Sequence, residues 1–225
     1  MRLSVIIPTF NEARTISNCL HSISQQEYPC QVIVADGGSS DGTLDLVPPP
    51  AEVVTSAKGR ASQMNAGARS ATGEVLLFLH ADTILPPGGL DSLARAMASN
   101  GAPGGAFRLA FAPSSPLLRF IGWCTTFPLK LFHYGDAGIF VRREVFEQLG
   151  GYADLALMED LDLWLKLYRC GRPFVLPTAV TTSSRRFMQR GVIRQQALNL
   201  GLVMLWLLGV SDRKLADWYY SQSGG

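Results

Sequence analysis

The chain has 225 residues, enough for one substantial domain. Hydrophobic residues make up 47% and charged residues 17%, which excludes intrinsic disorder as a description of the whole chain. The formal net charge is only +2, so the composition lacks the concentrated positive charge of a dedicated nucleic-acid binder, and we expect no nucleic-acid partner.

The cysteines and the apolar segments favour a cytoplasmic protein. The four cysteines form no C-x-x-C pair and no zinc spacing, so we expect free, buried thiols in a reducing compartment. The apolar run before Pro8 is too short for a signal peptide. The apolar stretch 197–210 is shorter than the roughly 18 to 20 residues that cross a bilayer. The sequence leaves open whether the protein also binds peripherally to the inner face of the membrane.

Apolar strand-like runs alternate with helical segments through the first half of the chain. Strands are predicted at 3–8, 31–35, 52–55 and 75–80, and helices at about 15–25, 60–70 and 88–99. A further, half-buried strand is predicted at 104–112. The alternation predicts a parallel sheet with helices on both faces.

The second half is less regular. It contains a Pro/Ser break at 113–116, an apolar helix-like stretch at 117–132, a loop at 133–138 and a helix that opens at 143–148. Another helix is expected to begin near Asp160, ahead of an apolar-rich segment.

Polar residues follow three of the predicted strands, at the sheet edge where open α/β folds bind ligands. The sets are Pro8, Thr9, Asn11 and Glu12, then Asp36, Ser39 and Asp41, then His80 and Asp82. Asp and Ser also make turns and helix caps, and that alternative stays open for the second set. Asp82 directly follows an apolar strand, where a carboxylate is costly unless it is paired, solvated or metal-bound.

Three further carboxylates stand close together at Glu159, Asp160 and Asp162. In the first turn of a helix the dipole favours negative charge, so capping is one explanation. Mutual repulsion would also raise at least one pKa and supply a candidate general base. Spacing alone leaves both explanations open.

Four motifs, in this order, resemble the family 2 glycosyltransferases of the GT-A fold. They are Ser-Val-Ile-Ile-Pro-Thr-Phe-Asn-Glu at 4–12, Val-Ala-Asp-Gly-Gly-Ser-Ser-Asp-Gly-Thr at 34–43, Phe-Leu-His-Ala-Asp-Thr at 78–83 and Glu-Asp-x-Asp-Leu at 159–163. The resemblance covers about residues 1–190. It implies an α/β domain with a mostly parallel central sheet, a nucleotide-binding half at 1–112 and an acceptor half at 113–190. A helical tail would follow at 191–225.

The resemblance implies an inverting transfer of a sugar from a nucleotide diphosphate donor, with a UDP-sugar favoured, to an acceptor hydroxyl. It also implies a divalent metal, manganese or magnesium, that stabilises the leaving diphosphate. Asp160 matches the family's catalytic base, and Glu159 is the next candidate. The implied donor-binding residues are Pro8, Thr9, Asn11, Glu12, Asp36, Ser39, Arg60, Asn65, His80 and Asp82. The implied acceptor-side residues are Gly135, Asp136, Arg185 and Arg186.

The chain departs from the family's pattern at the metal-binding Asp-x-Asp element. Asp82 aligns with its metal-binding carboxylate, but His80 stands where the first Asp is expected. Imidazole can ligate manganese or hydrogen-bond the ribose, and a satisfied buried histidine is the third interpretation. Phe187 replaces the tryptophan of a Gln-x-x-Arg-Trp element of longer members, which argues against a processive polysaccharide synthase.

The segment 185–214 carries six basic residues and one acid around its apolar stretch. Two roles are open: a helix that meets anionic lipid at a membrane surface, or a helix that packs on its own domain or on a twin subunit. The acceptor is not identified, and a lipid-linked acceptor is among the candidates.

Two other classes of function stay open. One is a nucleotide-sugar-binding protein that has lost catalysis. The other is a dinucleotide-dependent oxidoreductase, although no G-x-G-x-x-G follows the first strand.

Overall fold

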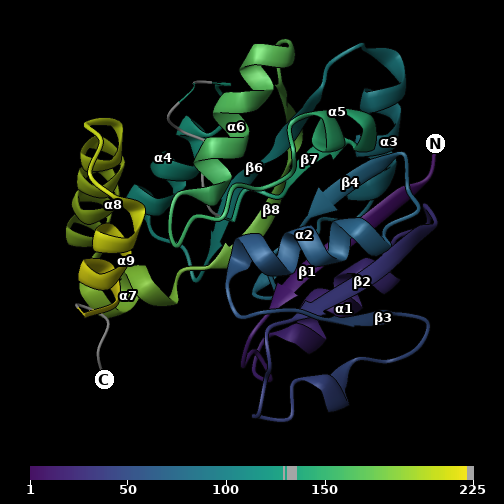
Figure 1. The fold of residues 1–225 in the computed structure, drawn as a ribbon, viewed down its shortest axis with the longest axis horizontal. Coiled ribbons are helices and arrows are strands. Elements are labelled where there is room, and N and C mark those ends of the chain that lie inside the picture. The colour runs from purple at the N-terminus through teal and green to yellow at the C-terminus, as the bar shows by residue number, and fades with distance from the viewer. Residues whose placement is uncertain (129, 131–135, 222–225) are drawn as a thin grey trace.

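The computed structural model describes residues 1–128, 130 and 136–221, and the strands within these residues form one sheet (Figure 1). The strands are β1 (Leu3–Thr9), β2 (Cys30–Asp36), β3 (Glu52–Thr55), β4 (Val75–Phe78), β5 (Thr83–Ile84), β6 (Gly104–Ala112), β7 (Ile139–Arg142) and β8 (Phe174–Ser183). The helices are α1 (Ile16–Ser24), α2 (Arg60–Ser70), α3 (Gly89–Ser99), α4 (Pro116–Cys124), α5 (Arg143–Gln148), α6 (Glu159–Cys170), α7 (Arg185–Arg190), α8 (Val192–Leu207) and α9 (Asp212–Ser221).

The sheet has the strand order β3-β2-β1-β4-β7-β6-β8-β5. The first four of these strands run parallel, with Thr9 opposite Asp36 and Ile6 opposite Phe78. Beyond β4 the sheet is mixed, because β7 runs antiparallel to both β4 and β6 while β8 is parallel to β6. The carboxyl ends of β1, β2 and β4 therefore meet at one edge, as the sequence predicts, and β7 begins at that same edge.

Helices cover both faces of the sheet, and the alternation of side chains along β1 divides the core in two. Val5 and Ile7 pack in one apolar cluster with α1 and α3. Ile6, between them, points to the opposite cluster with α2 and α6. At Gly67 of α2, an added Cβ would lie 2.5 Å from Ile6 Cγ2, so this helix packs on the strand at a distance that a side chain would prevent.

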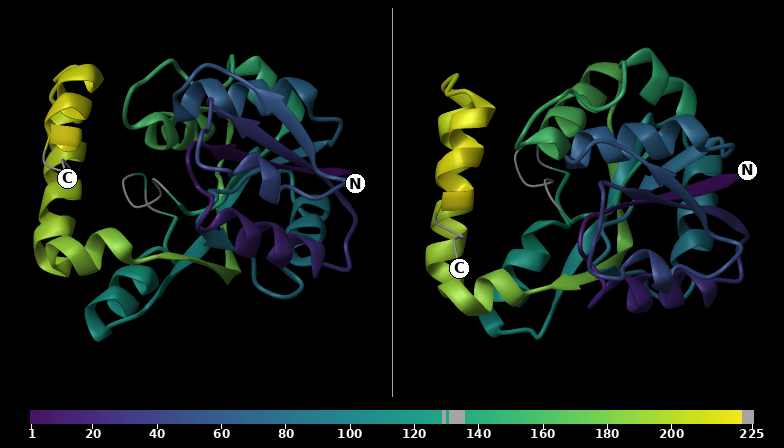
Figure 2. Two further views of the ribbon diagram at one scale, coloured as in Figure 1. Left: turned by 90° about the horizontal axis from the view of Figure 1, so that it is seen from below. Right: turned by 60° about the horizontal axis from the view of Figure 1, so that its bottom comes forward.

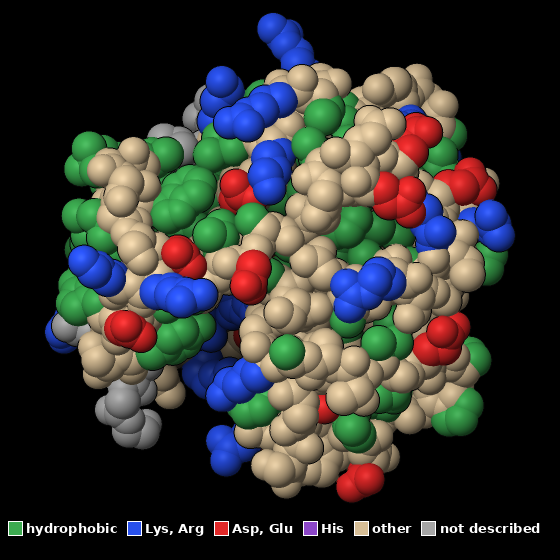
Figure 3. Space-filling model, viewed as in Figure 1, with side chains coloured by type: hydrophobic (Ala, Val, Ile, Leu, Met, Phe, Trp, Pro, Cys, Tyr) green, Lys and Arg blue, Asp and Glu red, His purple; other side chains and the backbone are tan. Residues whose placement is uncertain are grey.

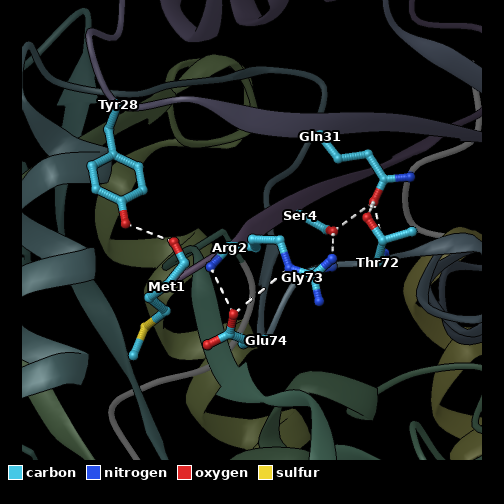
Figure 4. Close-up of polar contacts among 8 residues, drawn as sticks. All are labelled: Met1, Arg2, Ser4, Tyr28, Gln31, Thr72, Gly73 and Glu74. Atoms are coloured by element: carbon cyan, nitrogen blue, oxygen red, sulfur yellow. Dashed lines mark hydrogen bonds and ion pairs between the residues drawn. The ribbon is translucent and has the colours of Figure 1, made fainter.

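Hydrogen bonds join the other end of the parallel strands, away from the polar edge (Figure 4). The Ser4 hydroxyl donates to Gln31 Oε1 at 2.7 Å and accepts from the Gly73 N–H at 2.9 Å. Thr72 also donates to Gln31 Oε1, through its N–H and its hydroxyl. These bonds tie β1, β2 and the turn before β4 together and so help to fix the register in which their carboxyl ends meet.

Several sequence expectations need correction. Within the described residues of the helix-like stretch 117–132, regular helix occurs only in α4, which ends at Cys124, and the strand expected at 75–80 ends at Phe78. The strands β5, β7 and β8 were not predicted. The four cysteines are free, as expected, but only Cys19 is fully buried, and Cys170 is exposed.

The C-terminal helices form a separate layer at one end of the molecule (Figure 2). Leu202 of α8 packs with Leu215 and Tyr219 of α9, and Leu157 and Met158 pack against this cluster. One face of the tail therefore packs on its own domain. None of the helices in the described part of the chain is long and apolar enough to cross a membrane.

Candidate active site

A cavity of about 1260 Å³ lies between the polar sheet edge and the C-terminal helices. The predicted site residues that line it are Pro8, Glu12, Arg60, His80, Asp82, Asp136, Glu159, Asp160, Arg185 and Arg186. Figure 3 shows Lys and Arg side chains at the recess between the C-terminal helices and the rest of the domain. The fold thus brings together residues from both halves of the sequence. Gly135 lies outside the described residues.

The remaining predicted donor residues do not line the cavity. The buried Asp36 accepts hydrogen bonds at Oδ2 from the N–H groups of Gly38 and Ser39, at 2.8 and 2.9 Å. The Ser39 hydroxyl donates to Asp36 Oδ1 at 2.5 Å and accepts from the Asn11 N–H at 2.9 Å. Thr9 donates its hydroxyl to Ile7 O at 3.1 Å. These bonds hold the end of β1 and the loops after β1 and β2 in shape.

Asn65 also makes bonds within the fold. Its Nδ2 donates to Tyr152 O at 2.8 Å, and its Oδ1 accepts from the Tyr152 N–H at 2.9 Å. The side chain thereby joins α2 to the segment that leads toward α6.

Two carboxylates enter the cavity at the start of α6. Glu159 and Asp160 are each only 4% exposed, although both are acidic. Met158, which precedes them, has φ 73°, a left-handed conformation that is uncommon for a residue with a side chain. This turn directs the first residues of α6 toward the cavity, and it places both carboxylates where the helix dipole favours negative charge.

His80 stands between two carboxylates at the bottom of the cavity. Its Nδ1 is 2.8 Å from Asp136 Oδ1, and its Nε2 is 3.7 Å from Asp160 Oδ2. The half-buried Arg60 lies 3.7 Å from Glu159 Oε1. Two basic groups and three acidic groups from the segment after β4, from α2, from α6 and from the segment before β7 therefore form one charged cluster.

The cluster shifts the pKa values of its members in different directions. Burial, followed by repulsion from Glu159, raises the pKa of Asp160 to about 7, against the opposing influence of His80 and Arg60. Burial would raise the pKa of Asp136, but the adjacent His80 holds it well below its usual range. Burial would lower the pKa of His80, but Asp136 raises it above the ordinary value. Asp160 is therefore the carboxylate best suited to exchange a proton near neutral pH.

Comparison with known proteins decides the family. The sequence matches the family described as Glycosyl transferase family 2 over residues 4–150. The chain belongs to glycosyl transferase family 2. This membership argues against the oxidoreductase alternative.

Individual relatives are longer than this chain. The probable glycosyltransferase YdaM of Bacillus subtilis (strain 168) is 29% identical over 209 residues, which cover 80% of this chain and 50% of that protein. The poly(ribitol-phosphate) beta-N-acetylglucosaminyltransferase TarS of Staphylococcus aureus (strain Mu50) is 31% identical over 93 residues, which cover 36% of this chain and 16% of that protein. The chain therefore spans half of the first relative's length and much less of the second.

Solved structures share the fold of this chain. The structure of Staphylococcus aureus TarS in complex with UDP has a TM-score of 0.69 and 20% identity, and the match covers 81% of this chain and 60% of that chain. A mannosyltransferase from Pyrobaculum calidifontis, in complex with GDP-Man and Mn²⁺, has a TM-score of 0.67 and 24% identity, with 93% and 65% covered. The predicted GT-A fold is confirmed.

The charged cluster fits a divalent cation only in part. Within the described residues, no three His, Cys, Asp or Glu side chains are arranged to hold a metal by themselves. Burial and repulsion from Asp136, with a smaller effect of Glu12, raise the pKa of Asp82. A cation beside Asp82 and Asp136 would relieve this repulsion, and carboxylate oxygens are donors that Mn²⁺ and Mg²⁺ accept.

Four further side chains near the site were not predicted. The Thr182 hydroxyl on β8 donates to Asp136 Oδ2 at 3.0 Å. Gln63 Nε2 donates to Thr9 O at 2.5 Å and so links α2 to the end of β1. Tyr152 and Phe10 lie beside the cluster and at the cavity wall. The β-branched residues around Thr182 are a signal for β8, and Phe10 stands inside the motif at 4–12, but Gln63 and Tyr152 carry no motif.

Proposed function

We propose that this protein transfers a sugar from a nucleotide diphosphate donor to an acceptor hydroxyl, with inversion at the anomeric carbon, in the cavity beside Asp160. A UDP-sugar is the favoured donor, because two structures of TarS, which share this fold, contain UDP and UDP-GlcNAc. The mannosyltransferase structure contains GDP-Man instead. The observation that carries the proposal is the buried Asp160 carboxylate, whose pKa is raised to about 7 where it lines the cavity.

The chemistry assigned to Asp160 is general base catalysis. Its carboxylate takes the proton from the acceptor hydroxyl while the hydroxyl oxygen forms a bond to the anomeric carbon. The bond from that carbon to the diphosphate oxygen breaks on the opposite face, which inverts the configuration. A pKa near 7 favours this role for two reasons. At neutral pH a large share of the Asp160 carboxyl groups are ionised, and the carboxylate is more basic than an ordinary aspartate, so it accepts a proton more readily.

The leaving diphosphate needs positive charge in the donor half of the cavity. Arg60 lines the cavity and is assigned to the diphosphate. Arg186, which the sequence predicts on the acceptor side, is assigned to it as well, because it lines the cavity close enough to Asp82 to oppose the rise in the pKa of that carboxyl. Asp82 and Asp136 would hold a divalent cation, manganese or magnesium, with donor oxygens completing its coordination, and a bound cation supplies charge that stabilises the leaving group. His80 is assigned a positioning role between Asp136 and Asp160, since both of its ring nitrogens already face carboxylates.

The division of the chain follows from these assignments. We assign residues 1–190 to the transferase domain and 191–225 to a tail, of which the described helices α8 and α9 line the cavity. Pro8 and Glu12 are assigned to the nucleoside, while Thr9, Asn11, Asp36, Ser39 and Asn65 shape the loops and the helix around it. Contact of the tail with a membrane or with a twin subunit stays a prediction.

The test compares Asp160→Asn with Asp162→Asn, a control in the same helical turn that pairs with Lys166 at 2.7 Å instead. Hydrolysis or transfer from a panel of nucleotide sugars is measured together with nucleotide binding. Asp160→Asn should lose roughly a hundred- to ten-thousandfold in rate, with nucleotide affinity nearly unchanged. Retention of more than about a tenth of the activity would move the base elsewhere, with Glu159 the next candidate. Nucleotide binding without turnover of any donor in the wild type would favour the non-catalytic alternative.

A further inference from the structure

Beside the charged cluster, the cavity is lined by a set of large apolar side chains. Side chains from α4 and α8 line this part, among them Leu117, Phe120, Ile193 and Leu200. We name this set the apolar wall. The whole cavity, at about 1260 Å³, exceeds the roughly 300 to 1,000 Å³ of ordinary small-ligand sites. It has room for more than a nucleotide sugar.

The side chains of the apolar wall are not covered by the rest of the fold. Phe120 is 58% exposed, Ile193 is 75% exposed and Leu200 is 49% exposed, even though all three line the cavity. Apolar side chains of this size gathered on one concave surface mark a binding site more often than a solvated face. Because they come from two helices that flank a single cavity, one ligand can contact both.

The apolar wall is continuous with the charged cluster. Leu157 and Met158 line the cavity and immediately precede Glu159 and Asp160 in the chain. A molecule lying on this wall therefore ends next to the carboxylate assigned as the base. The donor cannot be that molecule, since its diphosphate belongs with Arg60 and Arg186 and it has no long apolar part to bury.

We propose that the acceptor is an amphipathic molecule: a hydroxyl head that reaches Asp160, attached to an apolar chain that lies between α4 and α8. This rests on the proposed transfer reaction and adds the substrate class to it. The same chemistry is offered by a lipid carrier in a membrane and by a dissolved apolar alcohol or glycoside. A purely polar sugar as acceptor would not cover the apolar wall, whose side chains would then stay exposed to water.

The experiment measures binding of the neutral fluorophore N-phenyl-1-naphthylamine to the full-length protein. Phe120→Ser and Leu200→Ser change the apolar wall. Phe127→Ser and Leu207→Ser are the matched controls, with the same residue types in or next to the same helices, 44% and 45% exposed, and outside the cavity lining. All four positions are exposed, so the variants should fold, and circular dichroism checks this.

The two wall variants should bind the fluorophore about tenfold more weakly or worse, because each removes one large apolar side chain from the contact. The two controls should stay within about twofold of the wild type by the same reasoning. UDP with manganese should bind all five proteins alike and should not displace the fluorophore. Equal loss in wall and control variants, or displacement of the fluorophore by UDP, would overturn the proposal.

Displacement by two amphiphiles then identifies the source of the acceptor. Octyl glucoside below its micelle concentration tests a dissolved molecule, and phosphatidylcholine vesicles carrying the same glucoside test a membrane-bound one. Displacement by either supports an amphipathic acceptor and names its source, whereas displacement by neither contradicts it. Failure of the transfer reaction itself would appear separately, as a wild type that does not bind or consume nucleotide sugars.

Discussion

His80 donates a hydrogen bond from Nδ1 to Asp136 Oδ1 across 2.8 Å and thereby joins the end of β4 to the segment before β7. Thr182 on β8 donates to the other oxygen of the same carboxylate at 3.0 Å. Three parts of the sheet thus meet at Asp136. The contact leaves an imidazole where the family pattern has an acidic residue, and this reduces the negative charge beside Asp82.

Replacing the His80 imidazole tests whether oxygens of the nucleotide sugar donor are needed to complete the coordination of the metal. His80→Asp would add a carboxylate beside Asp82 and Asp136, so manganese should bind the nucleotide-free protein roughly ten- to a hundredfold more tightly. Titration calorimetry without nucleotide measures this affinity. His21→Asp, on the exposed face of α1, is the control for an added carboxylate. A wild type that already binds manganese tightly, and loses this on His80→Ala, would show that histidine is a principal ligand.

Removing the carboxylate of Asp82 tests the metal dependence itself. Asp82→Asn lowers the negative charge that the donor's diphosphate must approach, so UDP should bind with nearly the same affinity in manganese and in excess chelator. The wild type should lose at least about tenfold in affinity on chelation. Asp45→Asn, at an exposed position, is the control and should behave as the wild type. Equal affinities with and without metal in the wild type would be inconsistent with a metal at this site.

The raised pKa of Asp160 predicts the pH dependence of turnover. A general base must be deprotonated, so kcat/KM should rise as pH increases through about 7 and level off above it. Glu159 is one cause of this raised pKa, so in Glu159→Gln the rise should occur at lower pH. Release of the nucleotide at several pH values measures both profiles. Identical midpoints in the two proteins would argue that another group titrates.

The hydrogen bonds of Ser4 predict a stability effect that is separate from the site. Ser4→Ala leaves the buried N–H of Gly73 without its acceptor and removes a donor from Gln31. The free energy of unfolding should fall by about 1 to 3 kcal/mol, which corresponds to a lower Tm by several degrees. Ser24→Ala is the control, since this hydroxyl is exposed and bonds only within its own helix, to His21 O. Thermal unfolding followed by circular dichroism compares the two, and equal Tm values would contradict the assigned role.

The first half of the fold is predictable because its signals are local. Apolar runs of β-branched residues, each followed by turn residues, define β1 to β4, and the predicted boundaries of β3, α2 and β6 agree with the structure. The strands β7 and β8 carry weaker patterns, and Pro177 lies inside β8. Their place beside β4 and β6 depends on long-range pairing, which the local sequence does not encode.

The sequence by itself determined the family, the parallel half of the sheet and the carboxylates that follow its strands, because motif order and hydrophobic periodicity are properties of the chain alone. Only the tertiary structure decided which of those side chains share a cavity. Asp36 ends β2 and Asp82 lies just beyond β4, yet Asp36 accepts hydrogen bonds from its own loop while Asp82 lines the cavity with Asp160. The difference arises because the pairing of β4 with β7 brings Asp136 to His80, and the packing of α6 and α8 encloses the space around them.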